Sequence, residues 1–321
     1  MTEVLPVFQY VEPDTLAAAI NALQADPTAM LCAGGTDLMV HLRKGLSEAG
    51  TVIHLDRIKD LNTLEYTKTG LRIGAGVSLA EIARNKVIAE HYSAIADAAN
   101  CVAGPSHREV ATLGGNLCLD TRCVYYNQSH WWRKSNNFCL KYRGDTCHVA
   151  PQGNRCRAAF SGELAPALIA HEAELEIAGP AGTRRVALND FYREDGAAHL
   201  RLEHGEIVVA AFVPSNGASS IYRKIAVRGA IDFPLAGVAV ACNKVNDATT
   251  FTIAITGTNS RPLLIDFDKK LATDTDVDSF FMSMEKQVQK SVSPQRTTTI
   301  APHYRRLSAA ALSVRLAKSL L

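Results

Sequence analysis

The feature that most constrains this chain of 321 residues is a segment in which a glycine pair leads into a cluster of cysteines. Gly114 and Gly115 stand in the run 112–116, which we expect to be a glycine loop, and glycines allow a backbone to approach a ligand closely. Five of the eight cysteines and both tryptophans follow before residue 161: Cys118, Cys123, Cys139, Cys147, Cys156, Trp131 and Trp132. This arrangement predicts two cofactor sites side by side.

Composition narrows the class of protein. The net charge of +2 gives no overall basic field, so we expect no nucleic-acid partner. The chain has no apolar run long enough to span a membrane, and its N-terminus has no basic and hydrophobic signal segment. We therefore expect no membrane association and a cytoplasmic protein, in which clustered thiols more often serve metal or redox chemistry than disulfides.

The periodicity of the apolar residues predicts an α+β fold. The first 58 residues have the pattern of strand, helix, strand, glycine turn, helix and strand, and Asp14 is the expected cap of the first helix. The polar turn at 214–217 is the expected domain boundary. After it we expect a smaller domain of three antiparallel strands and two helices. These strands are expected at 221–227, 235–242 and 251–255, and the last helix at about 304–320.

Two glycine turns precede expected helices. The turn at 33–38 can hold a phosphate on free backbone N–H groups, or Thr36 or Asp37 can simply cap the helix, and the simpler interpretation is slightly favoured. The run 74–79 imitates a dinucleotide fingerprint, but Leu79 stands where the third glycine belongs. We interpret 74–79 as a turn and a helix start.

The spacing of the clustered cysteines leaves their role open. Cys123, Cys139, Cys147 and Cys156 are separated by 15, 7 and 8 residues, too wide for the paired cysteines of structural zinc sites and unlike the tight ferredoxin runs. The aromatic and basic character of the insert favours an anionic iron–sulfur cluster. A zinc-stapled loop and unligated cysteines remain alternatives, and Cys118 can replace Cys123 as a ligand.

The remaining candidates have simpler interpretations. Cys32, Cys101 and Cys242 lie in apolar contexts typical of core positions. His107 and His148 flank the cofactor segments, where a lone histidine is more often structural. We identify no catalytic nucleophile or general base.

Three runs together resemble the FAD-binding subunits of the molybdenum hydroxylases, the xanthine dehydrogenase and carbon monoxide dehydrogenase group. The runs are AGGTDL at 33–38, ATLGGN at 111–116 and YRK at 222–224, and the resemblance covers nearly the whole chain. About forty additional residues precede the related segment SGELAPAL at 161–168. A cysteine-bearing insert at this place resembles that of the 4-hydroxybenzoyl-CoA reductase β subunits, which carry an additional [4Fe-4S] cluster.

The resemblance implies a fold and a set of site residues. It implies a two-part FAD-binding domain at 1–215, with subdomains at about 1–58 and 59–215, a cluster-binding insertion at about 118–158, and a C-terminal flavoprotein domain at 216–321. The implied cluster ligands are Cys123, Cys139, Cys147 and Cys156, without Cys118. The implied FAD-binding residues are Leu31, Cys32, Ala33, Gly34, Gly35, Thr36, Asp37, Leu38, Val102, Thr112, Leu113, Gly114, Gly115, Asn116, Glu163 and Lys224. Glu163 stands where relatives tend to carry Asp, and Lys224 can equally be a solvated lysine.

The resemblance also implies an electron relay. The substrate would be reduced at molybdenum on a large partner subunit. A small subunit with two [2Fe-2S] clusters would carry electrons between this chain and the large subunit, and the complex would be a dimer of heterotrimers. Reduced ferredoxin would supply electrons through [4Fe-4S] and FAD, and 4-hydroxybenzoyl-CoA would become benzoyl-CoA. One rival is the FAD subunit of another hydroxylase, which oxidises an aromatic substrate and reduces NAD. A second rival is a zinc-stapled nucleotide-binding scaffold.

Overall fold

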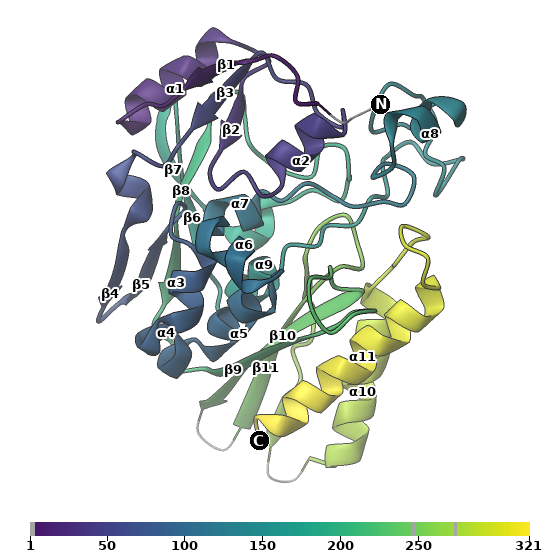
Figure 1. The fold of residues 1–321 in the computed structure, drawn as a ribbon. Helices are drawn as coiled ribbons and strands as arrows, with labels where there is room; N and C mark the ends of the chain where they lie inside the picture. Colours follow the sequence, from purple (N-terminus) through teal and green to yellow (C-terminus); the bar gives the residue numbers. More distant parts are fainter. Residues whose placement is uncertain (1–3, 246–247, 273–274) are drawn as a thin grey trace.

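The computed structural model describes residues 4–245, 248–272 and 275–321. Its elements form an N-terminal α/β unit, a central antiparallel sheet with helices, and a C-terminal sheet with two long helices (Figure 1). The expected α+β class is confirmed. None of the helices in these described residues is long and apolar enough to cross a membrane.

The N-terminal unit is a three-stranded parallel sheet in the order β1-β3-β2. Its strands are β1 (Gln9–Val11), β2 (Met30–Cys32) and β3 (Thr51–His54), and its helices are α1 (Leu16–Ala25) and α2 (Leu38–Arg43). Thr15, and not Asp14 as expected, caps α1, because its hydroxyl accepts a hydrogen bond from the Ala18 N–H.

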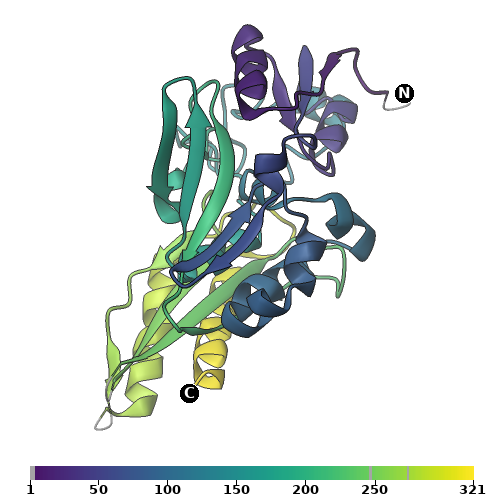
Figure 2. The ribbon, with the colours of Figure 1, turned by 90° about the vertical axis from the view of Figure 1, so that its left-hand side faces the viewer.

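The central sheet has the order β4-β5-β8-β6-β7 and is antiparallel throughout. Its strands are β4 (Leu64–Thr67), β5 (Gly70–Gly74), β6 (Glu174–Gly179), β7 (Gly182–Ala187) and β8 (Ile207–Pro214). Figure 2 shows this sheet beside the N-terminal unit and above the C-terminal unit.

Seven helices of the described residues accompany the central sheet and the segments beside it. They are α3 (Leu79–Arg84), α4 (Lys86–His91), α5 (Ser93–Cys101), α6 (Pro105–Val110), α7 (Leu113–Leu117), α8 (His130–Ser135) and α9 (Leu164–Ala170). The expected glycine loop at 112–116 is a short helix, because the Thr112 hydroxyl accepts from the Gly115 N–H and starts α7.

The C-terminal unit contains the three expected strands and two short additional ones. β9 (Ser219–Ile225), β10 (Ala236–Val245) and β11 (Ala248–Thr256) pair antiparallel, with β12 (Leu263–Ile265) and β13 (Lys270–Ala272) both pairing with β11. The helices α10 (Val277–Ser291) and α11 (Pro302–Ser319) pack against each other, and α11 packs on β10. α9 lies against β10 and β11 and thereby joins this unit to the rest of the chain.

The cysteine-rich insert is mostly irregular and has α8 as its only helix among the described residues. It has a small apolar core of its own, which includes Cys123, Tyr126 and Cys139 together with Leu46 of the N-terminal unit. Arg133 attaches the insert to that unit, because its guanidinium donates to the carbonyl oxygens of Lys44 and Gly45. The insert is therefore packed against the region that follows α2.

Candidate cofactor sites

A cavity of about 1050 Å³ lies where the three units meet, and we call it the large cavity. Its size is at the upper end of the range for small-molecule and cofactor sites. The β2–α2 turn, α6 and α7, and the β9–β10 connection all contribute to its lining. The expected FAD-binding residues that line it are Leu31, Cys32, Ala33, Gly34, Gly35, Thr36, Asp37, Leu38, Val102, Thr112, Gly115, Asn116 and Glu163.

The glycine pair of the β2–α2 turn is required by the protein's own backbone. A Cβ atom on Gly34 would lie 1.8 Å from the carbonyl oxygen of Val110 at the end of α6. Gly35 has a φ of +67°, a conformation that side chains other than glycine rarely adopt. The turn is therefore held against the segment before α7, and both segments line the same cavity.

Asp37 stands at the start of α2 without capping it. Its side chain makes no capping hydrogen bond and pairs instead with the Arg122 guanidinium from the insert. The simple capping interpretation of this turn is therefore wrong for Asp37. The first turn of α2 faces the large cavity and is linked to the insert by an ion pair.

Leu113 and Gly114 are placed behind the cavity wall. Leu113 is fully buried in the main core. The Gly114 N–H donates to the Ala75 carbonyl at 2.7 Å, and a Cβ on Gly114 would lie 2.8 Å from the Ala75 Cβ. The absence of a side chain at Gly114 thus allows α7 to pack against β5 and its following turn.

Glu163 and Lys224 form a buried ion pair at the cavity's edge. The Lys224 Nζ lies 2.8 Å from Glu163 Oε1 and also donates to the Cys101 and Asp232 carbonyls. Lys224 does not line the large cavity, whereas Glu163 does. Burial raises the pKa of Glu163, with the Lys224 charge and the Tyr222 hydroxyl acting against that rise. Lys224 therefore holds Glu163 at the edge of the large cavity, and its contact with FAD stays a prediction.

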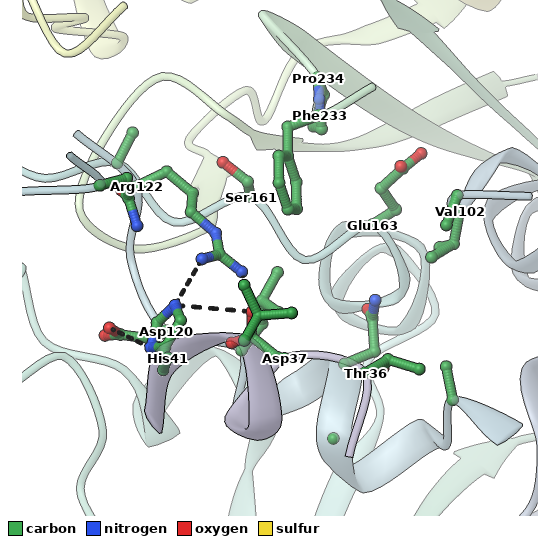
Figure 3. Close-up of a pocket in the computed structure, with 18 of the residues that line it drawn as sticks. Thr36, Asp37, His41, Val102, Asp120, Arg122, Ser161, Glu163, Phe233 and Pro234 are labelled. Carbon is green, nitrogen blue, oxygen red and sulfur yellow. Dashed lines mark hydrogen bonds and ion pairs between the residues drawn. The ribbon is translucent and has the colours of Figure 1, made fainter. Parts of the chain in front are cut away.

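A chain of charged groups crosses the cavity on the side of the insert (Figure 3). His41 Nε2 lies 2.7 Å from an Arg122 guanidinium nitrogen, and His41 Nδ1 lies 3.6 Å from Asp120 Oδ2. Burial, reinforced by Arg122, lowers the pKa of His41 against the effect of the carboxylates. The basic residues of the insert were noted from the sequence, but their partners on α2 were not, since no sequence spacing connects them.

The C-terminal unit contributes a second part of the wall that the sequence did not reveal. Phe233 and Pro234 of the β9–β10 connection line the cavity, and the Arg122 guanidinium lies over the Phe233 ring at 4.7 Å (Figure 3). Arg305 of α11 is fully buried and donates to the Leu235 and Gln295 carbonyls. Long-range contacts of this kind leave no local signal in the sequence.

A second, much smaller cavity lies inside the insert, and we call it the cysteine cavity. All four expected cluster ligands line it: Cys123, Cys139, Cys147 and Cys156. Each of these cysteines is at least nine-tenths buried and free of a disulfide. Burial raises the pKa of Cys123 to about 11 and that of Cys156 to about 12.

The donor set fits an iron–sulfur cluster, and the free space is small. The cysteine cavity measures about 10 Å³, room for about one water molecule. Among the described residues, no three His, Cys, Asp or Glu side chains meet closely enough to hold one metal ion. The thiols thus line a common space without converging on one point.

Cys118 is separated from this group. It lines the large cavity and not the cysteine cavity, whereas Cys123 lines both. Cys32 and Cys242 are buried, and Cys101 is partly buried. Of the two alternatives left open by the spacing, the arrangement favours Cys123.

Comparisons with known proteins agree with this geometry. The family described as "FAD binding domain in molybdopterin dehydrogenase" matches residues 6–216. The putative xanthine dehydrogenase FAD-binding subunit XdhB of Escherichia coli (strain K12) is 30% identical over 241 residues, which are 74% of this chain and 69% of that protein. The aldehyde oxidoreductase FAD-binding subunit PaoB of the same strain is 31% identical over 246 residues, 73% of this chain and 77% of that protein.

A solved structure shows the same fold over the whole chain. A chain of the Cu,Mo-CO dehydrogenase in its cyanide-inactivated form superimposes with a TM-score of 0.79 and 20% identity. The match covers 99% of this chain and 98% of that chain.

Proposed function

The chain belongs to the family of FAD-binding domains of molybdopterin dehydrogenases, and on that premise we propose that it is the electron-transfer subunit of a 4-hydroxybenzoyl-CoA reductase. As a member of this family it is the FAD-binding subunit of a molybdenum hydroxylase-type oxidoreductase. The observation that carries the finer proposal is that four cysteines line one small cavity next to the large cavity. The family match ends at residue 216, which supports dividing the chain at about residue 215.

The large cavity supports the proposed FAD site. Its volume of about 1050 Å³ is sufficient for a dinucleotide, and the β2–α2 turn that resembles the family motif lines it. We assign the diphosphate and adenosine to residues 31–38, and the flavin to the region of Val102, Thr112, Gly115 and Asn116. FAD would supply a carrier of one or two electrons, while the chain's own residues bind it and exclude water.

The insert supports the proposed [4Fe-4S] site. Cys123, Cys139, Cys147 and Cys156 would hold the cluster, which would supply single-electron transfer. Aromatic and basic side chains line the same cavity, including Tyr125, Tyr126 and Lys141. Cationic surroundings suit an anionic thiolate cluster.

In the proposed reaction, this subunit passes electrons and another subunit carries out the bond cleavage. Two electrons and two protons convert 4-hydroxybenzoyl-CoA to benzoyl-CoA and water, so two one-electron equivalents must come from a donor such as reduced ferredoxin. We propose a large molybdenum subunit and a small [2Fe-2S] subunit as partners in a dimer of heterotrimers, in an anaerobic cytoplasmic route of aromatic degradation.

Two rivals predict different behaviour. The FAD subunit of a hydroxylase that reduces NAD requires access of a nicotinamide to the flavin. The insert forms part of the wall of the large cavity, because Asp120, Arg122 and Cys123 all line it, and its place beside the proposed flavin site favours a donor other than NAD. A zinc-stapled scaffold would contain one zinc ion and show no visible colour.

The test is the reaction of the purified, oxygen-free complex. We expect reduced ferredoxin to drive formation of benzoyl-CoA from 4-hydroxybenzoyl-CoA, followed by liquid chromatography. We expect the flavin, once reduced, to be reoxidised slowly by NAD in stopped-flow mixing. Rapid flavin oxidation by NAD, together with no benzoyl-CoA, would instead identify the hydroxylase.

A further inference from the structure

The two cavities share part of their lining. Three residues line both: Cys123, Tyr126 and Lys141. Cys123 is one of the proposed cluster ligands, and Tyr126 is a buried aromatic residue whose hydroxyl donates to the Leu46 carbonyl at 3.0 Å. Lys141 is the one charged residue of this shared wall.

Lys141 is held tightly in that wall. Its side chain is only 7% exposed. The ammonium donates to Asp120 Oδ1 and to the Thr121 hydroxyl, each at 2.5 Å, and Thr121 in turn donates to the Gly196 carbonyl at 2.6 Å. The Nζ also lies 4.5 Å from the centre of the Tyr126 ring. These contacts fix the position of the ammonium relative to both cavities.

The charges around Lys141 are balanced. Asp120 is its carboxylate partner. Burial acts to raise the pKa of Asp120, but the Lys141 ammonium, together with His41 and His199, lowers it. Arg122 is paired with Asp37, and burial lowers the pKa of His41. Removing either member of the Asp120–Lys141 pair therefore leaves one uncompensated charge next to both cavities.

We propose that the Asp120–Lys141 ion pair sets the reduction potentials of the flavin and of the iron–sulfur cluster together. This inference rests on the proposed function, because it needs a redox centre in each cavity. A buried charge acts strongly on its neighbours, since the low-polarity interior screens it weakly. Reduction adds negative charge, so a nearby cation favours it and a nearby carboxylate opposes it.

The two single substitutions should act in opposite directions. Lys141→Met leaves the Asp120 carboxylate unbalanced and should lower both potentials. Asp120→Asn leaves the ammonium unbalanced and should raise both. The double substitution restores the balance of charge and should return both potentials toward those of the wild type.

The experiment uses the oxygen-free holoprotein with its cofactors. Flavin potentials come from spectroelectrochemical titration and cluster potentials from titration followed by electron paramagnetic resonance. We expect each single variant to change the oxidised-to-reduced ratio of the cluster at fixed potential about tenfold, which is about 59 mV for a one-electron centre. Lys134→Met is the matched control, because Lys134 is an exposed lysine of the same insert that lines neither cavity.

The outcomes separate this inference from the proposed function. Opposite shifts in both centres, cancelled in the double variant, would support it. Unchanged potentials in cofactor-loaded Lys141→Met, or the same shift in Lys134→Met, would overturn it and leave the proposed function standing. If Lys141→Met lost its cofactors, Asp120→Asn with unshifted potentials would overturn it equally. Wild-type protein without iron would overturn the proposed function by metal analysis, and this coupling with it.

Discussion

The large cavity and the cysteine cavity are built in different ways. Helices and strands such as β2, α2 and α7 form part of the walls of the large cavity, together with turns and loops of all three units, and the main core lies behind them. The cysteine cavity is formed within one irregular insert that has α8 as its only described helix. A cavity built by packed elements keeps its shape from packing alone, whereas a cavity built by loops depends on the groups that tie the loops together.

The contacts that hold the insert together illustrate this dependence. Its apolar core is a small cluster in which three of the members are proposed ligands, Cys123, Cys139 and Cys156. Side-chain-to-backbone hydrogen bonds, such as those of Arg133, also hold the loops of the insert in place. We therefore expect the two regions to respond separately when they are perturbed.

The largest expected effect is the loss of the iron–sulfur cluster when one thiol of the cysteine cavity is removed. Cys139→Ser should remove the cluster and keep FAD, because Cys139 lines only the smaller cavity. Iron should fall from about four atoms per chain to near zero, while the flavin absorbance remains, as measured by metal analysis and visible spectroscopy on one sample.

Cys118→Ser is the matched control, since Cys118 lines the large cavity alone. It should retain its iron. If Cys139→Ser lost FAD as completely as iron, the two regions would not be independent, and if it kept its iron, Cys139 would not be a ligand.

The second largest effect should be on protein stability and FAD retention, when a side chain is added in the wall of the large cavity. In Gly34→Ala the new Cβ would lie 1.8 Å from the Val110 carbonyl oxygen, so the β2–α2 turn and the segment before α7 must move apart. We expect a loss of about 3 kcal/mol in the free energy of unfolding and weak FAD retention, measured by denaturant unfolding and by flavin content. The iron content should change less than the flavin content.

Gly229→Ala provides the comparison, because a Cβ there has no protein atom within 4 Å. Its stability and flavin content should match those of the wild type. A Gly34→Ala protein with normal stability and normal flavin content would show that the contact between the turn and Val110 does not shape the cavity.

A smaller effect is expected at low pH, where protonation of a buried histidine should lower the stability of the main core. Burial lowers the pKa of His171 to about 4, from 6.5, and the side chain is fully enclosed beside Ser220. The folded state thus holds this proton less tightly than the unfolded state, so its contribution to stability is present above pH 6.5 and is lost as the pH falls toward 4. The loss should reach about 2 to 3 kcal/mol at pH 4.5, two units below the unfolded-state pKa, since each pKa unit is about 1.4 kcal/mol.

Urea unfolding at several pH values measures this contribution. His171→Gln should flatten the dependence between pH 6.5 and 4.5 whether or not iron is present, and replacement of the exposed His204 should leave it unchanged. A pH dependence that vanished on removal of iron alone would assign the effect to the insert and not to the core.

The sequence was sufficient to predict the features that depend on local patterns. Apolar periodicity located the elements of the N-terminal unit and the three long C-terminal strands, and the glycines at 34 and 35 marked a turn that needs the small side chain. The exceptions were local as well: Thr15 replaced Asp14 as a cap, and Thr112 converted an expected loop into α7. Competing polar side chains next to a helix start are difficult to rank from sequence alone.

The features that could not be predicted depend on contacts between distant segments. The ion pairs Asp37–Arg122 and Asp120–Lys141 became visible only when the insert was seen to fold back on α2. The same holds for the ion pair between Lys224 and Glu163. Spacing could suggest that four cysteines act together, but only the fold separates Cys118 from the other members of the insert.

The central claim is that an iron–sulfur cluster and a flavin occupy adjoining cavities of one chain. The most direct measurement is iron, zinc, sulfide and FAD content, with the visible spectrum, of the protein purified without oxygen. The account predicts about four iron atoms, about four sulfides and one FAD per chain, with a brown-yellow spectrum that partly bleaches on reduction. A chain that contains FAD and zinc but no iron, or neither pigment, would contradict it.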